Sequence, residues 1–121
     1  RVDHGDRPLD DLERALRALD AYEYFHAFVP QLFAGDARGS LATIEKGLDL
    51  LPDEGNFLFG RVGALLATGD LDAAQRELRA LVTTRGSWAE LFRQFVAKGM
   101  MSLPAGASTE DILQSDPGSR P

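Results

Sequence analysis

Apolar side chains recur along this chain at spacings of three and four residues, which is the period of an amphipathic α-helix. The first series comprises Leu9, Leu12, Leu16 and Leu19 on one helix face, and it continues through Tyr22, Phe25, Phe28, Val29 and Leu32. No run of alternating apolar and polar residues predicts a strand. The pattern therefore predicts an all-α protein of about five helices.

Turn and cap residues set the expected limits of the first helix. Asp6 is a suitable N-cap, and Pro8 fits the first turn, where a missing N–H costs nothing. Pro30 removes a backbone donor and predicts a kink or a break. Gly35 is expected to end the helix.

Four further helices are predicted over residues 37–51, 54–68, 71–84 and from Ser87 to just before Gly99. Ser87 is followed three residues later by Glu90, which predicts a capping box. Residues 104–121 are rich in Ser, Pro, Gly and Asp and are predicted to form a loosely ordered tail. Within this tail, Ile112 and Leu113 are suited to a short docked turn.

A 34-residue repeat is the strongest organisational signal, since Gly35-Asp36 and Gly69-Asp70 each separate two predicted helices. This is the period of the tetratricopeptide unit, a helix–turn–helix that stacks on its neighbours because one pair cannot bury its own apolar face. The repeat register also pairs Phe25 with Phe59, Leu32 with Leu66, Ser40 with Ala74, Ile44 with Leu78 and Pro52 with Gly86. We therefore expect a short right-handed tetratricopeptide-like stack over 1–103, with 1–7 as a linker and 88–96 as the capping helix.

Composition narrows the functions that such a stack can have. The 121 residues carry 13 Lys and Arg against 19 Asp and Glu, a net charge of −6, which argues against nucleic acid or an anionic membrane as the main partner. The chain has no cysteine, so disulfides, thiol nucleophiles and Cys-based zinc sites are excluded. The compartment is left open, with the cytoplasm slightly favoured as an expectation.

The opening residues, Arg1-Val2-Asp3-His4-Gly5-Asp6-Arg7-Pro8-Leu9, followed by Leu12 and Leu16, resemble a junction in a bacterial N-terminal-nucleophile-hydrolase-like family of unknown function. In that family a catalytic domain ends in an Arg-Val-Asp-Asp-His-x-x-Pro-like stretch that leads into a tetratricopeptide-like tail. Segments 56–59, 67–70, 88–93 and 99–101 look like parts of that tail. This chain has a single Asp, Asp3, before His4, where the family stretch has two. The resemblance implies an upstream catalytic domain and carries no catalytic residue onto this chain.

An apolar concave face is the main candidate site. The repeat register places one set of residues on it: Tyr22, Phe25, Val29, Phe33, Asn56, Phe59 and Leu66. A hydrophobic partner, a second copy of the chain or the capping helix folded back would cover such a face, and plain core packing is the alternative. Tetratricopeptide domains that clamp a peptide carboxylate use Lys and Asn where this chain has Phe25, Val29 and Phe59, so that binding mode is not expected.

We therefore expect a non-catalytic protein-interaction or oligomerisation module, an accessory C-terminal domain of a hydrolase-like protein, with no cofactor or metal. Its expected partner is protein: the upstream domain, a second copy or a peptide. A free-standing peptide-binding repeat protein is the alternative. A small metal-dependent enzyme using Asp3, His4 and His26 is a remote alternative. The structural explanation of the same residues is that Asp3 and His4 lie at a solvated helix N-terminus and that His26 is a partly buried structural histidine.

Overall fold

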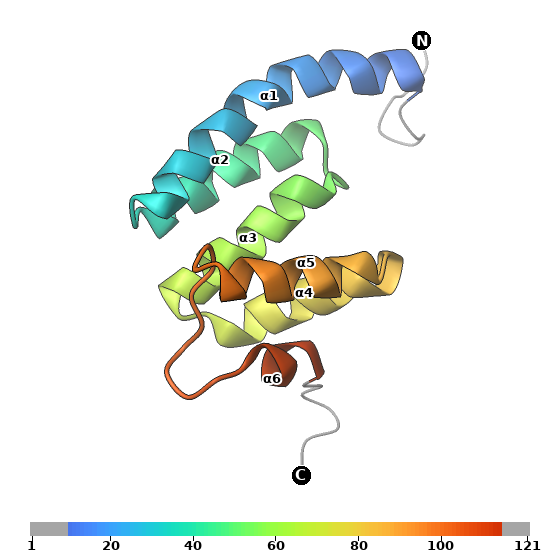
Figure 1. The fold of residues 1–121 in the computed structure, drawn as a ribbon. Helices are drawn as coiled ribbons and strands as arrows, with labels where there is room; N and C mark the ends of the chain where they lie inside the picture. Colours follow the sequence, from blue (N-terminus) through green and yellow to red (C-terminus); the bar gives the residue numbers. More distant parts are fainter. Residues whose placement is uncertain (1–9, 115–121) are drawn as a thin grey trace.

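The computed structural model describes residues 10–114, and the regular secondary structure of this part of the chain is all helix, with no strand. Six helices follow one another (Figure 1): α1 Asp11–Phe33, α2 Ala37–Leu50, α3 Gly55–Thr68, α4 Leu71–Thr84, α5 Ser87–Ala97 and α6 Thr109–Gln114. The predicted all-α class is confirmed.

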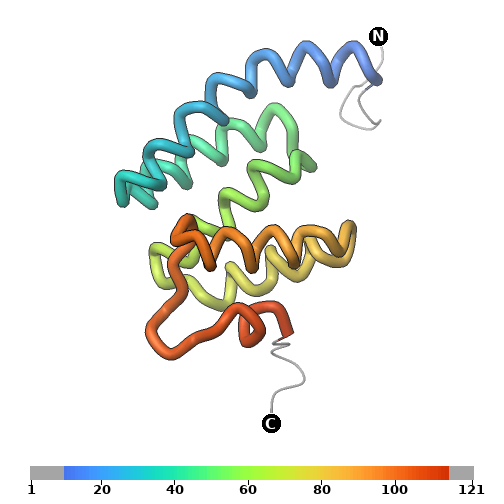
Figure 2. The backbone as a smooth tube through the Cα atoms, viewed as in Figure 1, coloured from blue at the N-terminus to red at the C-terminus, as the bar shows by residue number. Residues whose placement is uncertain are grey.

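Successive helices pack against each other as antiparallel neighbours. The chain reverses direction at each short connection, so that α1 lies on α2, α2 on α3, and α3 on α4 (Figure 2). Helix α5 returns along α4, and α6 packs below both of them. Each helix therefore covers the apolar face of the helix before it, which a single helix could not shield alone.

The two Gly-Asp turns have nearly the same backbone geometry, 34 residues apart. Gly35 and Gly69 both adopt the left-handed conformation, with φ of +86° and +87°, where the lack of a Cβ removes the steric penalty. Asp36 and Asp70 follow with φ/ψ of −89°/69° and −87°/73°, and the carboxylate of each accepts from an amide of the next helix. The sequence repeat is therefore a repeat of helix ends.

Two of the position pairs related by the repeat are also equally buried. Ser40 and Ala74 are both 0% exposed, and Ile44 and Leu78 are 0% and 1% exposed. Small side chains at the first pair allow close helix approach, while the second pair fills the space between the helices of each hairpin. The Ser40 hydroxyl donates to a backbone carbonyl within its own helix, 2.8 Å away, which satisfies its buried polar atom.

Three local predictions about helix limits differ from the structure. Of the kink or break predicted at Pro30, the break does not occur, because α1 continues through Pro30 to Phe33 as one element. Its N-cap is Asp10, in a capping box with Glu13, whereas the predicted cap Asp6 lies outside the described residues. The Ser87 capping box is wrong. Gly86 is already in the right-handed helical conformation, so Ser87 lies inside α5, which has no side-chain cap.

Helix α6 lies in the segment predicted as a loosely ordered tail. Ile112 is 2% exposed and joins the core cluster below α4 and α5. Arg93 of α5 donates from Nε and Nη2 to the two carboxylate oxygens of Glu110, at 2.8 and 3.2 Å. The predicted docked turn at residues 112–113 is thus a short helix that an ion pair and an apolar anchor hold in place, while 115–121 lie outside the described residues.

We expect this docking to weaken in acid. The hydrogen bond from Arg93 holds the pKa of Glu110 below its usual range. A carboxylate with a lowered pKa in the folded state stabilises above the pKa of the unfolded chain and loses that contribution as pH falls through the folded value. The Ile112 methyl resonance should therefore move towards its random-coil position below about pH 4. In Glu110→Gln the same resonance should show no such titration, and an unchanged wild-type signal down to pH 3 would contradict the prediction.

Candidate interaction groove

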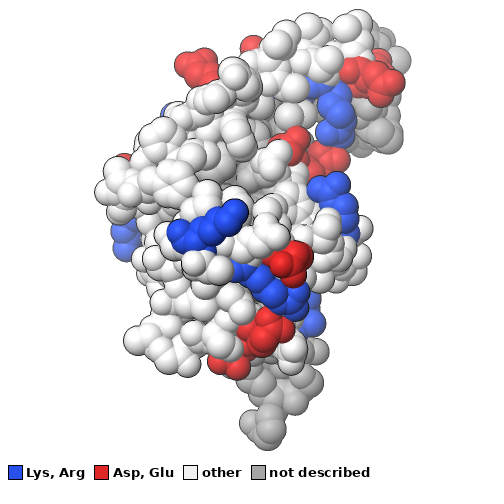
Figure 3. All heavy atoms as spheres, viewed as in Figure 1, with Lys and Arg blue, Asp and Glu red and all other residues white. Residues whose placement is uncertain are grey.

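An apolar groove lies between α1 and α5, and α3 forms its floor. In the space-filling view a hollow separates the upper layer of the molecule from α5, and the surface around it is mostly uncharged, with one basic side chain at its lower edge (Figure 3). The cavity at its centre has a volume of about 190 Å³. Its lining comprises Phe25, Phe28, Val29, Leu32, Phe33, Asn56, Phe59, Gly60, Phe95, Met100 and Met101.

Aromatic contacts set the positions of the two walls. On the α1 side, the rings of Phe25 and Phe28 meet edge-on with centroids 5.4 Å apart. On the α5 side, Phe95 meets Phe59 of the floor edge-on at 5.1 Å. Edge-to-face pairs at these distances are favourable beyond simple burial and resist rotation of either ring. The groove is therefore bounded by rings that other rings hold in place.

Glycines in α3 bring the floor close to both walls. A Cβ added at Gly60 would meet the ring of Phe28, and one added at Gly63 would lie 3.1 Å from Cε of Met101. The backbone of α3 thus touches side chains of α1 on one side and of the 99–101 turn on the other. These contacts determine how deep the groove is.

The groove is almost purely apolar. Among the described residues that line the central cavity, Asn56 is the one polar side chain. An adjoining hollow of about 250 Å³ extends it along α1; the two share Phe25 and Asn56, and the second adds Tyr22 and Glu54. Apolar walls with so few polar atoms favour binding of an apolar group, and they supply no general acid or base in the central cavity.

Five of the predicted concave-face residues, Phe25, Val29, Phe33, Asn56 and Phe59, line this cavity together. Tyr22 lies in the adjoining hollow and is 63% exposed. Leu66 does not reach the groove. It is 5% exposed and packs in the cluster that α3 forms with α4 and α5, because the closing helix covers that end of α3.

Reasoning from sequence missed the second wall, which Phe95, Met100 and Met101 provide. The folded-back capping helix was one of three expected covers for the concave face, and α5 covers it in part. Gly99 is left-handed, with φ of +76°, and turns the chain so that the two methionines line the cavity together with residues of α1 and α3. Gly99 following an apolar helix is the signal that predicts such a turn.

The remote metal site finds no support in the described part of the chain. Asp3 and His4 lie outside it. His26 is exposed rather than partly buried, because it lies on the outer side of α1, where its ring meets Tyr22 edge-on at 4.1 Å. Residues 10–114 contain no group of three or more His, Asp or Glu side chains placed to hold a metal ion. Over the same residues, no helix is long and apolar enough to cross a bilayer.

A larger hollow, about 590 Å³, lies elsewhere, between α3, α4 and the start of α5. Its charged side chains already have partners within the protein. Arg61 pairs with Glu77 and Glu45, and the guanidinium of Arg85 stacks 5.2 Å from the centre of the Trp88 ring. Paired groups of this kind leave little for a ligand to bind, so size alone does not make this hollow the better candidate.

No protein-family model, curated protein or solved structure matches this chain. Functional inference therefore rests on the residues of the chain itself. In the groove between α1 and α5, apolar side chains from three helices converge around an open space with a single polar side chain in its lining.

Proposed function

We propose that this chain is a non-catalytic protein-interaction module that binds an apolar segment of another polypeptide in the groove between α1 and α5. The observation that carries the proposal is the lining, which brings five aromatic rings and one polar side chain around an open cavity. Sites for small ligands usually measure about 300–1,000 Å³. A central cavity of about 190 Å³ favours a protein side chain over a cofactor.

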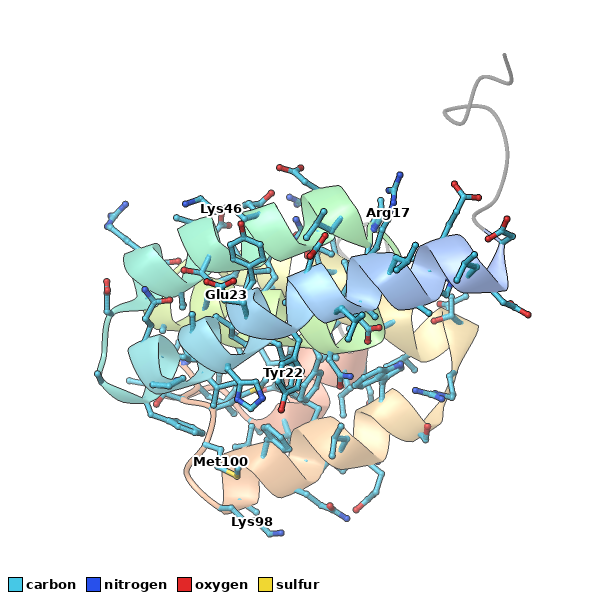
Figure 4. The ribbon with its side chains drawn as sticks, turned by 90° about the horizontal axis from the view of Figure 1, so that it is seen from above. Arg17, Tyr22, Glu23, Lys46, Lys98 and Met100 are labelled. Carbon is cyan, nitrogen blue, oxygen red and sulfur yellow. The ribbon has the colours of Figure 1, made fainter. Side chains whose placement is uncertain are left out.

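The expected affinity is modest. Burying one large apolar side chain contributes roughly 1.5–3 kcal/mol, and association loses several kcal/mol of rotational and translational freedom. A partner therefore needs several apolar side chains along the groove, from the exposed ring of Tyr22 to Met100 at the other end (Figure 4). We expect dissociation constants in the micromolar range.

Two finer statements belong to the same proposal. The helix pairs 11–50 and 55–84 are of tetratricopeptide type, which the matching Gly-Asp helix ends support. The second statement is that the module is the accessory C-terminal part of a hydrolase-like protein, and this statement is supported by the sequence resemblance alone. A free-standing peptide-binding protein would use the same groove, so the groove can be tested without choosing between them.

A blocked peptide with Leu and Phe at positions i, i+3, i+4 and i+7 in a neutral polar background is a suitable probe. Titrated into ¹⁵N-labelled protein, it should shift the amide resonances of Val29, Asn56 and Met100 with saturation. Phe33→Glu should weaken binding at least tenfold, because a carboxylate at the groove edge must lose water when the peptide docks. Phe33 is 58% exposed, so its replacement leaves the core intact.

Ala97→Glu is the matched control, since it adds the same charge at an exposed position of α5 that does not line the groove. It should bind the peptide like the wild type. Equal affinity of the Phe33→Glu and wild-type proteins, or no shifts at millimolar peptide, would overturn the proposal.

A further inference from the structure

A stripe of three leucines runs along the outer face of α1, away from the groove. Leu12, Leu16 and Leu19 are 69%, 55% and 74% exposed. Their spacing of four and three residues places them above one another on successive turns. The side chains of α1 that enter the core, Ala21 and Phe28, are both 3% exposed and lie on the opposite side of the helix. We call the three leucines the leucine stripe.

Polar contacts, not the leucines, hold the first half of α1 to the rest of the protein. Arg14 donates from Nη1 and Nη2 to the two carboxylate oxygens of Asp53, at 3.2 and 3.1 Å. Arg17 donates from Nη1 to the carbonyl of Leu50, at 3.2 Å. Figure 4 shows Arg17 directed towards α2 and Tyr22 directed to the other side of α1. The leucine stripe is thus left more than half exposed to solvent.

The charges around the leucine stripe are of one sign. Asp20 and Glu23 are exposed, and each stands one turn after a leucine of the stripe. The two arginines of α1 are both turned towards α2 and its following loop, as described above. The outer face of α1 therefore presents aliphatic side chains beside the carboxylates of Asp20 and Glu23, and neither carboxylate forms an ion pair with another residue of 10–114.

We propose that the leucine stripe is a docking surface for a basic amphipathic helix of another protein. Aliphatic side chains of that helix would cover the three leucines, and its flanking Lys or Arg side chains would meet Asp20 and Glu23. A second copy of this chain fits less well. Two leucine stripes packed together would bring acidic flanks against each other, and like charges in such positions repel.

Two fluorescein-labelled helical peptides test this proposal on the full chain. Both carry leucine at the same a and d positions, but one has Lys and the other Glu at the flanking positions. In anisotropy titrations at about 50 mM salt the Lys peptide should bind at least tenfold more tightly than the Glu peptide. Raising the salt to about 500 mM should remove most of that difference, because exposed charges are then screened within a few ångströms.

The double variant Leu16→Gln/Leu19→Gln should bind the Lys peptide at least tenfold more weakly than the wild type does. Both positions are exposed, so the fold should be retained. Ala42→Gln, at an exposed position of α2, is the control and should bind like the wild type. The charge variant Asp20→Lys/Glu23→Lys should bind the Glu peptide more tightly than the Lys peptide, which reverses the wild-type order of affinities. Phe33→Glu should leave both affinities unchanged, which separates this surface from the groove.

Several outcomes would overturn the proposal: no binding of either peptide, equal affinities, or affinities that the leucine replacements do not change. Analytical ultracentrifugation tests whether a second copy of this chain binds the leucine stripe. A wild-type dimer that the Leu16→Gln/Leu19→Gln variant loses would assign the leucine stripe to a second copy of the chain instead.

Discussion

Replacing Phe57 with alanine is expected to lower the free energy of unfolding by about 4 kcal/mol. Phe57 is 2% exposed and lies where three helices meet. Its ring centroid is 6.2 Å from that of Phe25 and 5.8 Å from that of Phe28, both on α1. Gly47 of α2 lies so close that a Cβ there would be 2.5 Å from the ring. Removing the ring leaves a cavity that rigid helix backbones cannot close.

Urea denaturation followed by circular dichroism at 222 nm measures this change. Phe33→Ala is the matched control, because it removes the same ring from the same helix bundle where the side chain is 58% exposed. It should cost less than about 1 kcal/mol. Similar losses for the two variants would show that Phe57 does not hold α1, α2 and α3 together in the way its burial indicates.

Gly60→Ala is expected to lower the free energy of unfolding by about 2 kcal/mol, because the added methyl group overpacks the core. In most helices this change would be favourable by up to about 1 kcal/mol, since alanine is the better helix former. At Gly60 the new methyl group would meet the ring of Phe28. That ring is 3% exposed and packed against Phe25, so it has no free space to move into.

Gly63→Ala, one turn further along α3, provides the comparison. Its methyl group would lie 3.1 Å from Cε of Met101, the far end of a flexible side chain, and 3.4 Å from Leu32. A methionine can change rotamer at small cost, so this variant should change stability by less than about 1 kcal/mol. The same urea measurement serves both variants. A stabilised Gly60→Ala protein would show that the floor and wall of the groove can separate more easily than their contact indicates.

Helix limits that depend on local caps were predicted well from the sequence. Helix α4 has the expected bounds, 71–84, and α2 and α3 differ from theirs by one residue each. Gly69 and Asp70 explain this success. A left-handed glycine and an N-cap carboxylate act on the adjacent turn, so the residues that decide such a limit are next to it in sequence.

The residue at which α5 begins is set by a tertiary contact as well as by the adjacent residues in the sequence. Ser87 and Glu90 have the spacing of a capping box, yet helical geometry begins one residue earlier, at Gly86. Trp88 is 7% exposed and stacks on Phe59 with ring centroids 5.1 Å apart. Placing this large ring against α3 matters more to the free energy than one cap, and a local motif carries no information about that contact.

The groove was predicted in part for a related reason. The repeat register brought Phe25, Val29 and Phe59 to one face, because α1 and α3 occupy equivalent places in the repeat. Phe95 and Met100 belong to no repeat unit. Their place depends on the direction in which α5 returns, and that direction follows from packing against α4 and α3.

Helix α1 separates most clearly what the order of residues could establish from what required the folded protein. The periodicity established that Leu12, Leu16 and Leu19 share one face of a helix, since that follows from the helical repeat alone. Which face of the helix is buried was settled by its neighbours: α2 and α3 receive Ala21 and Phe28, and the leucines are left outside. Periodicity is a property of one helix, whereas burial is a property of two surfaces in contact.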